Sequence, residues 1–348
     1  MSNRYSPDAD LPVPAPDFGN LLKVLACEAP SRPTLFEFFL NGPLYRRLAA
    51  HTGLDVASAP DWLIVQRGFL AAGYDYATTH LPGFVFPADE RAHASTVSLN
   101  EGAVITDRGS YDAYAWPDPA EANYAFLDEA AEALPPGMKL IVPCPGGVLE
   151  NVIKLVGYEP LCIMIADDEQ LVFDLFEQVG SRLAAMYVRA APHPAVGACI
   201  SNDDWGFKSQ TMLSPADMRR FVFPWHELIV EKIHAAGKPA ILHSCGYYGE
   251  VIDDVIESMG YDGRHSYEDT IEPVEQAYDS LRGRIAVMGG IDVDFICRHS
   301  PQEVYERSAA MLDRSSPGGF ALGTGNSVPE YVPDEGYMAM IRAALDRR

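Results

Sequence analysis

Short apolar runs alternate with longer amphipathic stretches along most of this chain. After the fourth run, apolar residues recur at helical spacing between positions 218 and 233. Most of the other intervals also have room for a helix and carry a helical pattern. The runs themselves are rich in aliphatic, aromatic and β-branched residues, as is typical of buried strands, and they cover residues 34–40, 74–80, 139–144, 196–201, 239–243, 261–266, 285–288 and 320–323.

Two helix starts are marked by capping residues. Ser214 and Ser300 are each followed by a proline and, three positions after the serine, by Asp217 or Glu303. A serine cap with proline at the first helical position and an acid at the third is a typical helix start. Pro224 lies inside the first of these helices, so we expect it to kink that helix or split it in two.

Eight strands interleaved with helices predict a parallel sheet with helical crossovers. The count matches a closed (β/α)8 TIM barrel, and 348 residues, although long for one ordinary domain, is within the range of this fold. We therefore expect one barrel domain over residues 1–348, with an open doubly wound sheet as the alternative. Residues 81–117 read as an insertion after the second strand, expected as a hairpin over the barrel mouth. Residues 1–18 read as an extended or flexible N-terminal arm.

Composition narrows the classes of protein. Hydrophobic residues make up 48% of the chain, enough for a large core without disulfides, and the six cysteines form no CxxC pair. This pattern predicts a reducing, cytoplasmic setting, in line with a polar N-terminus and no apolar run long enough for a membrane span. The formal charge of −23 disfavours nucleic acid and anionic membranes as partners. Solubility or a partner with a basic docking face would explain it.

Polar residues and glycines gather where the predicted strands end. In a barrel the carboxyl ends of the strands carry the chemistry, so five consecutive polar ends indicate one active site. The first three ends carry Glu37, Asn41, His80 and Cys144; the last five carry Asp203, Asp204 and Trp205, then His243 and Cys245, then His265, Tyr267, Glu268 and Asp269, then Asp292, and finally Thr324 and Asn326.

The pair His243 and Cys245 is the sharpest chemical signal. Two residues apart at a strand end, their side chains share one face, so a ring nitrogen and a thiol lie side by side as a tetrahedral zinc site requires. Zinc needs at least a third protein ligand. We predict Glu268, which ends the next strand 23 residues after Cys245; the rivals are Asp269, His265 and Asp204.

Other strand-end residues are assigned roles around this metal. Asp204 and His265 are predicted catalytic residues, although Asp203 and Asp204 could equally organise their loop. Trp205 could equally be a packing residue. The chain has no G-x-S-x-G elbow and no G-x-G-x-x-G after a strand, which disfavours serine acyl transfer and a dinucleotide cofactor. The predicted substrate-binding residues are His80, Asp203, Trp205, Tyr247 and Asn326.

Several segments together resemble the uroporphyrinogen decarboxylase superfamily over about residues 20–346. They are DDWG at 203–206, HSCG at 243–246, GGID at 289–292 and GTGNSVP at 323–329. The resemblance implies a (β/α)8 barrel. The decarboxylase itself holds its substrate carboxylates with an arginine-rich segment near the N-terminus. The matching residues 32–41 have one arginine and then become apolar and acidic, which speaks against decarboxylation.

The His-x-Cys pair resembles the corrinoid-dependent methyltransferase branch of this superfamily. That branch holds zinc with His-x-Cys and a later cysteine in the last strand-end loop, where this chain has Asn326 and no cysteine. Cobalamin-independent methionine synthase, a related barrel, uses a glutamate at the position that Glu268 matches to within a residue. The resemblance implies zinc as cofactor, and a corrinoid (cobalamin) carried on a partner protein.

The implied activity is methyl transfer between a small methyl donor and the corrinoid protein, in the demethylase half-reaction. The aromatic residues near the strand ends favour an aryl methyl ether, with methanol, methylamine or a thiol left open, as is the direction of transfer. The alternatives are a metal-free lyase of the decarboxylase type that uses Asp204, and a barrel that only binds a ligand or partner. The sequence leaves open whether the chain forms a homodimer.

Overall fold

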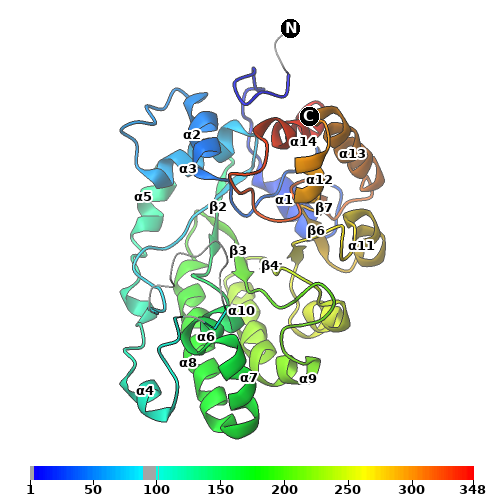
Figure 1. Cartoon of the computed structure of the whole chain (residues 1–348). Coiled ribbons are helices and arrows are strands. Elements are labelled where there is room, and N and C mark those ends of the chain that lie inside the picture. Colours follow the sequence, from blue (N-terminus) through cyan, green and yellow to red (C-terminus); the bar gives the residue numbers. More distant parts are fainter. Residues whose placement is uncertain (1–3, 89–98, 101) are drawn as a thin grey trace.

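Seven parallel strands form the centre of this computed structural model, which describes residues 4–88, 99–100 and 102–348 (Figure 1). Their order in the sheet follows their order in the chain, and the sheet curls in a TIM-barrel-like manner. The strands are β1 (Tyr76–Thr78), β2 (Lys139–Pro143), β3 (Val196–Asn202), β4 (Ala240–His243), β5 (Gly263–His265), β6 (Ala286–Met288) and β7 (Phe320–Ala321).

Helices connect the strands and pack against the sheet, as parallel pairing requires. For example, α10 contacts β3 and β4, and α1 contacts β7. The strands are buried almost throughout, which explains their nearly continuous apolar sequences. The α-helices are α1 (Phe18–Leu25), α2 (Gly42–Ala50), α3 (Asp61–Ala71), α4 (Arg108–Ala113), α5 (Phe126–Glu132), α6 (Val148–Val156), α7 (Tyr158–Asp167), α8 (Glu169–Ala190), α9 (Pro215–Asp217), α10 (Phe223–Ala235), α11 (Val274–Leu281), α12 (Val293–Arg298), α13 (Pro301–Arg314) and α14 (Asp334–Leu345).

The predicted first strand, residues 34–40, is the one that the structure does not form. This segment pairs with the C-terminal part of the chain only through isolated bridges, Leu35 with Leu322 and Leu40 with Val328. On its other side, the Tyr76 hydroxyl accepts from the Glu37 N–H at 2.7 Å and donates to the Glu37 carbonyl at 2.6 Å. A side chain thus takes the hydrogen bonds that a ladder to β1 would need, and the described sheet has seven strands instead of eight.

The predicted helix signals are confirmed. Ser214 caps α9 by accepting from the Asp217 N–H, and Ser300 and Glu303 form the capping box of α13. Pro224 lies in the first turn of α10, directly after the π-helical turn Met218–Val222. The split that Pro224 predicts therefore takes the form of a π turn between two α-helical pieces, because proline cannot donate the hydrogen bond that would join them.

The N-terminal arm packs on the C-terminal helices. Tyr5 is buried and its hydroxyl donates to Gln302 at 2.8 Å, while Arg4 pairs with Asp346. The expected hairpin within 81–117 falls partly on 89–98 and 101, outside the described residues; the described part contains α4 and no strand. Of the described helices, none is both long and apolar enough to cross a membrane.

Candidate metal centre

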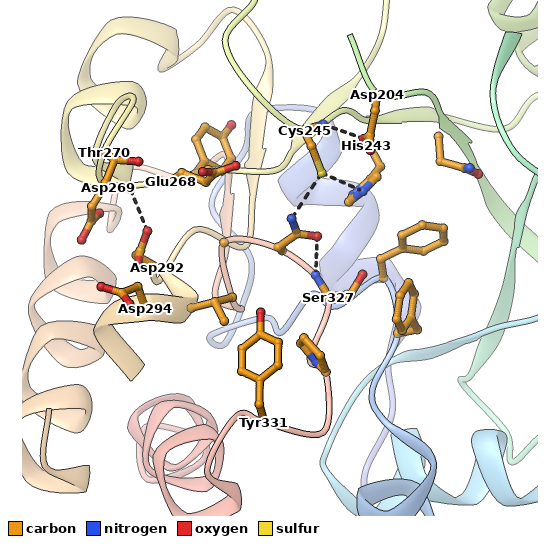
Figure 2. A pocket seen from close by; sticks show the side chains of 18 of the residues that line it. Asp204, His243, Cys245, Glu268, Asp269, Thr270, Asp292, Asp294, Ser327 and Tyr331 are labelled. Atoms are coloured by element: carbon orange, nitrogen blue, oxygen red, sulfur yellow. Dashed lines mark hydrogen bonds between the residues drawn. The ribbon is translucent and has the colours of Figure 1, made fainter. Parts of the chain in front are cut away.

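Strand register brings three potential metal ligands together. Asn202 of β3 lies opposite His243 of β4, so two residues further along Asp204 lies beside Cys245. The Cys245 N–H donates to Asp204 Oδ1 at 2.9 Å, and Cys245 Sγ lies 3.8 Å from His243 Nε2. One ligand atom from each of Asp204, His243 and Cys245 lies within 4.8 Å of the other two (Figure 2).

This donor set fits zinc. Ideal tetrahedral zinc bonds of about 2.3 Å to sulfur and about 2.05 Å to nitrogen put the two ligand atoms roughly 3.6 Å apart. The separation of 3.8 Å between Cys245 Sγ and His243 Nε2 is close to that value. Nitrogen, sulfur and carboxylate oxygen are the three zinc ligand types, and three protein ligands leave a fourth position for a substrate. The geometry therefore fits a catalytic site better than a closed structural one.

The carboxylate that meets this spacing is Asp204, whereas the sequence predicts Glu268. His265 of β5 pairs with His243, so the same register sets Tyr267 opposite Cys245 and puts Glu268 one residue out of phase. Glu268 lines the same cavity but lies apart from the three ligands (Figure 2). Of the described acids, Asp204 is therefore the one grouped with His243 and Cys245.

His265 lies behind His243 and fixes its tautomer. His265 Nε2 donates to the Thr324 carbonyl at 3.2 Å, so His265 Nδ1 is an acceptor and takes the proton of His243 Nδ1 at 2.7 Å. This leaves the lone pair of His243 Nε2 directed toward Cys245. Burial lowers the pKa of His243 to about 4. Burial and the neighbouring His243 ring also lower the pKa of His265, so both rings are neutral. His265, predicted to be catalytic, is fully buried and contacts His243 rather than the cavity.

The Thr324 peptide is itself held by a buried acid, Glu37. Glu37 Oε1 accepts from the Thr324 N–H at 2.6 Å, and Glu37 Oε2 lies 2.7 Å from the Thr324 hydroxyl. The hydroxyl also bonds to the Asn326 carbonyl, which can only accept, so the hydroxyl proton is committed there. In its protonated form, Glu37 supplies the proton of the bond between its carboxyl group and this hydroxyl. In agreement, burial raises the pKa of Glu37 to about 8.

Asn326 donates a hydrogen bond to the sulfur of Cys245. Its Nδ2 lies 3.2 Å from Cys245 Sγ, while its Oδ1 accepts from the Ser327 N–H at 2.7 Å, and this second bond sets the orientation of the amide. Burial and the charge of Asp204 raise the pKa of Cys245. In such surroundings a metal cation is what would make the thiolate the favoured form. Asn326, predicted to bind substrate, thus contacts the sulfur of one of the three candidate ligands.

The three candidate ligands face a cavity of about 1280 Å³ at the carboxyl ends of the strands. Two of the predicted substrate residues, His80 and Asn326, line this cavity. Aromatic side chains contribute much of its apolar wall: Phe38, Phe39, Tyr267, Phe295 and Tyr331. Its charged wall includes Glu150, Glu268, Asp269, Asp292, Asp294, Lys208 and Arg298. A ligand here would meet aromatic faces and acids together.

Asp203, also predicted to bind substrate, is fully buried and does not line the cavity. Its carboxylate accepts from the N–H groups of Leu149 and Glu150 in the first turn of α6, both at 2.9 Å, and from His226 Nε2 at 2.9 Å. An acid at a helix N-terminus satisfies amides that have no partner within the helix. Asp203 therefore organises the loop. This is the structural role that the sequence analysis left open beside substrate binding.

Trp205 and Tyr247 are likewise not among the cavity residues that the structure describes. Trp205 is fully buried and packs on Phe223, His226 and Tyr248, with ring centroids 4.9 to 5.7 Å apart. Its place on the opposite face from Asp204 follows from the alternation of side chains along an extended segment. The packing role that the sequence left open for Trp205 is the one observed.

Glu150 is among the cavity residues that the sequence analysis does not single out. Glu150, in the first turn of α6, accepts from the Gly147 N–H at 2.7 Å, and Asn202 Nδ2 lies 3.4 Å from it. Burial and the neighbouring Asp203 and Asp204 raise its pKa to about 8. The available signal was the acid three residues after Gly147, a capping pattern that by itself indicates only a helix start.

Comparisons with known proteins agree with the fold. The sequence model of the family described as uroporphyrinogen decarboxylase (URO-D) matches residues 104–346, more than half of the chain. No curated protein sequence matches the chain significantly.

Two solved structures show the same fold at low sequence identity. A methyltransferase from Methanosarcina mazei aligns with a TM-score of 0.66 and 13% identity, over 93% of this chain and 97% of that one. A protein assigned as a vitamin-B12-independent methionine synthase from Listeria monocytogenes aligns with a TM-score of 0.52 and 14% identity, over 92% and 98%.

Proposed function

Because the chain belongs to the uroporphyrinogen decarboxylase family, we propose that it uses this barrel for methyl transfer: it is a zinc-dependent methyltransferase of the corrinoid-dependent branch. It moves a methyl group between a small methyl donor and a corrinoid carried on a partner protein. The observation that carries the proposal is the grouping of Asp204, His243 and Cys245 on a large cavity. The similarity in fold to a Methanosarcina mazei methyltransferase supports it.

In this proposal Asp204, His243 and Cys245 hold the zinc. Bound there, zinc would supply a Lewis acid that polarises the heteroatom of the methyl donor. His265 keeps the proton of His243 on Nδ1, so that Nε2 is free to ligate, and Asn326 stabilises the sulfur by donating to it. The cavity walls orient the donor and exclude water while the methyl group moves.

A carboxylate as third ligand favours activation of the methyl donor over stabilisation of a thiolate acceptor. A second thiolate, such as the branch carries in its last loop, would leave zinc more electron-rich than Asp204 does. The set with Asp204 therefore suits activation of an ether or alcohol better than storage of a thiolate. Among the donors we favour an aryl methyl ether, because aromatic side chains line much of the cavity; methanol, methylamine and thiols are the comparison substrates.

The alternative function, decarboxylation, would need cationic side chains in the cavity to hold the substrate carboxylates. Arg32 is the single arginine in residues 32–41, and its guanidinium is engaged by Asp75 at 2.5 Å and by the Ala15 carbonyl at 2.9 Å. Arg32 is not among the described residues that line the cavity. With Lys208 and Arg298 set against six carboxylates in this lining, a polycarboxylate substrate would meet net repulsion.

The experiment is a methyl-transfer assay with reduced cobalamin. The purified protein is incubated with Co(I) cobalamin, alone or on a corrinoid protein, and with each donor in turn, while the cobalt absorption spectrum reports formation of methyl-cobalt. We expect conversion with at least one donor, loss of conversion in Cys245→Ser, and retention in Cys297→Ser, which changes another cysteine of the cavity wall. Conversion that survives Cys245→Ser and a strong chelator would refute the proposal.

A further inference from the structure

A second cavity opens beside the candidate metal centre. Its volume is about 760 Å³, and it shares Pro145, Gly146, Glu150 and Asp204 with the first cavity. Asp204 is one of the three candidate ligands, so a molecule in the second cavity would have one end next to the metal centre. The side cavity, as we call it, is completed by Leu99, Asn151, Ile153, Lys154, Gly206, Phe207 and Met212.

The wall of the side cavity differs in chemistry from that of the first cavity. Away from the junction its side chains are mainly apolar, with Leu99, Ile153, Phe207 and Met212 among them, whereas its two acids both lie at the junction. Phe207 is 40% exposed and meets Tyr158 edge to face, with ring centroids 5.7 Å apart. A large partly exposed aromatic ring and a methionine sulfur are favourable contacts for an aromatic ligand.

We propose that the side cavity binds the aromatic ring of the methyl donor and leaves its methoxy group at the junction. The inference rests on the proposed function and adds which part of the protein selects the donor. A donor of the size of methanol or methylamine would leave nearly all of the apolar wall without contact. A ring, by contrast, buries its faces against the wall and directs its substituent toward Glu150 and Asp204, the polar groups of the junction.

The test measures binding of guaiacol (2-methoxyphenol) and of anisole by isothermal titration calorimetry. Leu99→Trp narrows the side cavity, and Leu22→Trp places the same substitution on the exposed face of α1, where Leu22 is 44% exposed. We expect wild type and Leu22→Trp to bind with equal affinity and Leu99→Trp to bind at least about tenfold more weakly. Far-UV circular dichroism checks that each variant folds.

Two further variants separate this inference from the proposed function. Phe207→Ala removes an aromatic wall without adding bulk and should also weaken binding about tenfold. His243→Ala should lose zinc yet bind guaiacol nearly as wild type, because the ring lies outside the metal centre. Affinity unchanged in both Leu99→Trp and Phe207→Ala, or no binding of either compound to wild type, overturns the inference. Failure of methyl transfer with these binding results intact overturns only the proposed function.

Discussion

Replacing Glu37 with glutamine tests the buried hydrogen-bond chain behind the metal centre. In its protonated form Glu37 accepts from the Thr324 N–H and donates to the Thr324 hydroxyl, whose own proton goes to the Asn326 carbonyl. Glutamine offers the same pair, an oxygen acceptor and an N–H donor, with no ionisable group. The substitution therefore keeps the hydrogen bonds and removes only the proton equilibrium.

The magnitude follows from the two pKa values. The ordinary pKa of a glutamate is 4.5, and burial raises that of Glu37 to about 8 in the folded protein. Between these values the folded state keeps a proton that the unfolded state has released, so stability falls as pH rises through this window. Each pH unit costs about 1.4 kcal/mol, and the total across the window is about 5 kcal/mol. Below pH 4.5 both states are protonated and Glu37 makes no pH-dependent contribution.

Urea unfolding of wild type and Glu37→Gln at about pH 5 and about pH 8 measures this effect. We expect the free energy of unfolding of the variant to rise relative to wild type by several kcal/mol between the two pH values. Glu129→Gln, on the exposed side of α5, serves as the control and should track wild type. A constant difference between wild type and Glu37→Gln at both pH values would show that Glu37 has no raised pKa, and the reasoning would fail.

Three further predictions concern the metal centre and its supports. His265→Phe keeps the ring shape but removes the acceptor for the neighbouring histidine, so zinc affinity, measured by competition with a chromophoric chelator, should fall about 10- to 100-fold; unchanged affinity would contradict the tautomer argument. Asp203→Ala leaves His226 and two helix amides without their acceptor and should cost about 3–5 kcal/mol in metal-free urea unfolding; a loss below about 1 kcal/mol would contradict its structural role. Asp204→Asn should weaken zinc binding while Glu268→Gln leaves it unchanged; the reverse order would reinstate Glu268 as the ligand.

The sequence predicts most of the architecture because burial on both faces leaves a direct trace. Seven of the eight apolar runs contain a strand, and both serine caps begin helices. The run at 34–40 is apolar for the same reason, since it is buried, yet the Tyr76 hydroxyl takes its hydrogen bonds on one side. The hydrophobic pattern indicates which residues are buried, but not which group each N–H bonds to. It therefore could not predict that residues 34–40 form no strand.

The candidate site was predictable in part. His243 and Cys245 were identified because their relationship is local, two residues apart on one strand end. The third candidate ligand depends on the register between strands, which places Asp204 and not Glu268 beside Cys245. Asp203 and Asp204 are adjacent acids in the sequence, but they point to opposite faces, one to a buried helix end and one to the cavity. Only the fold distinguishes them.

X-ray absorption of the zinc-loaded protein tests the central claim most directly. The account predicts one zinc per chain with one sulfur ligand at about 2.3 Å and the remaining ligands nitrogen or oxygen. In Cys245→Ser the sulfur ligand should disappear, and in Cys297→Ser it should remain. Failure to bind zinc, a second sulfur ligand, or a sulfur signal that persists in Cys245→Ser would contradict a centre built from Asp204, His243 and Cys245.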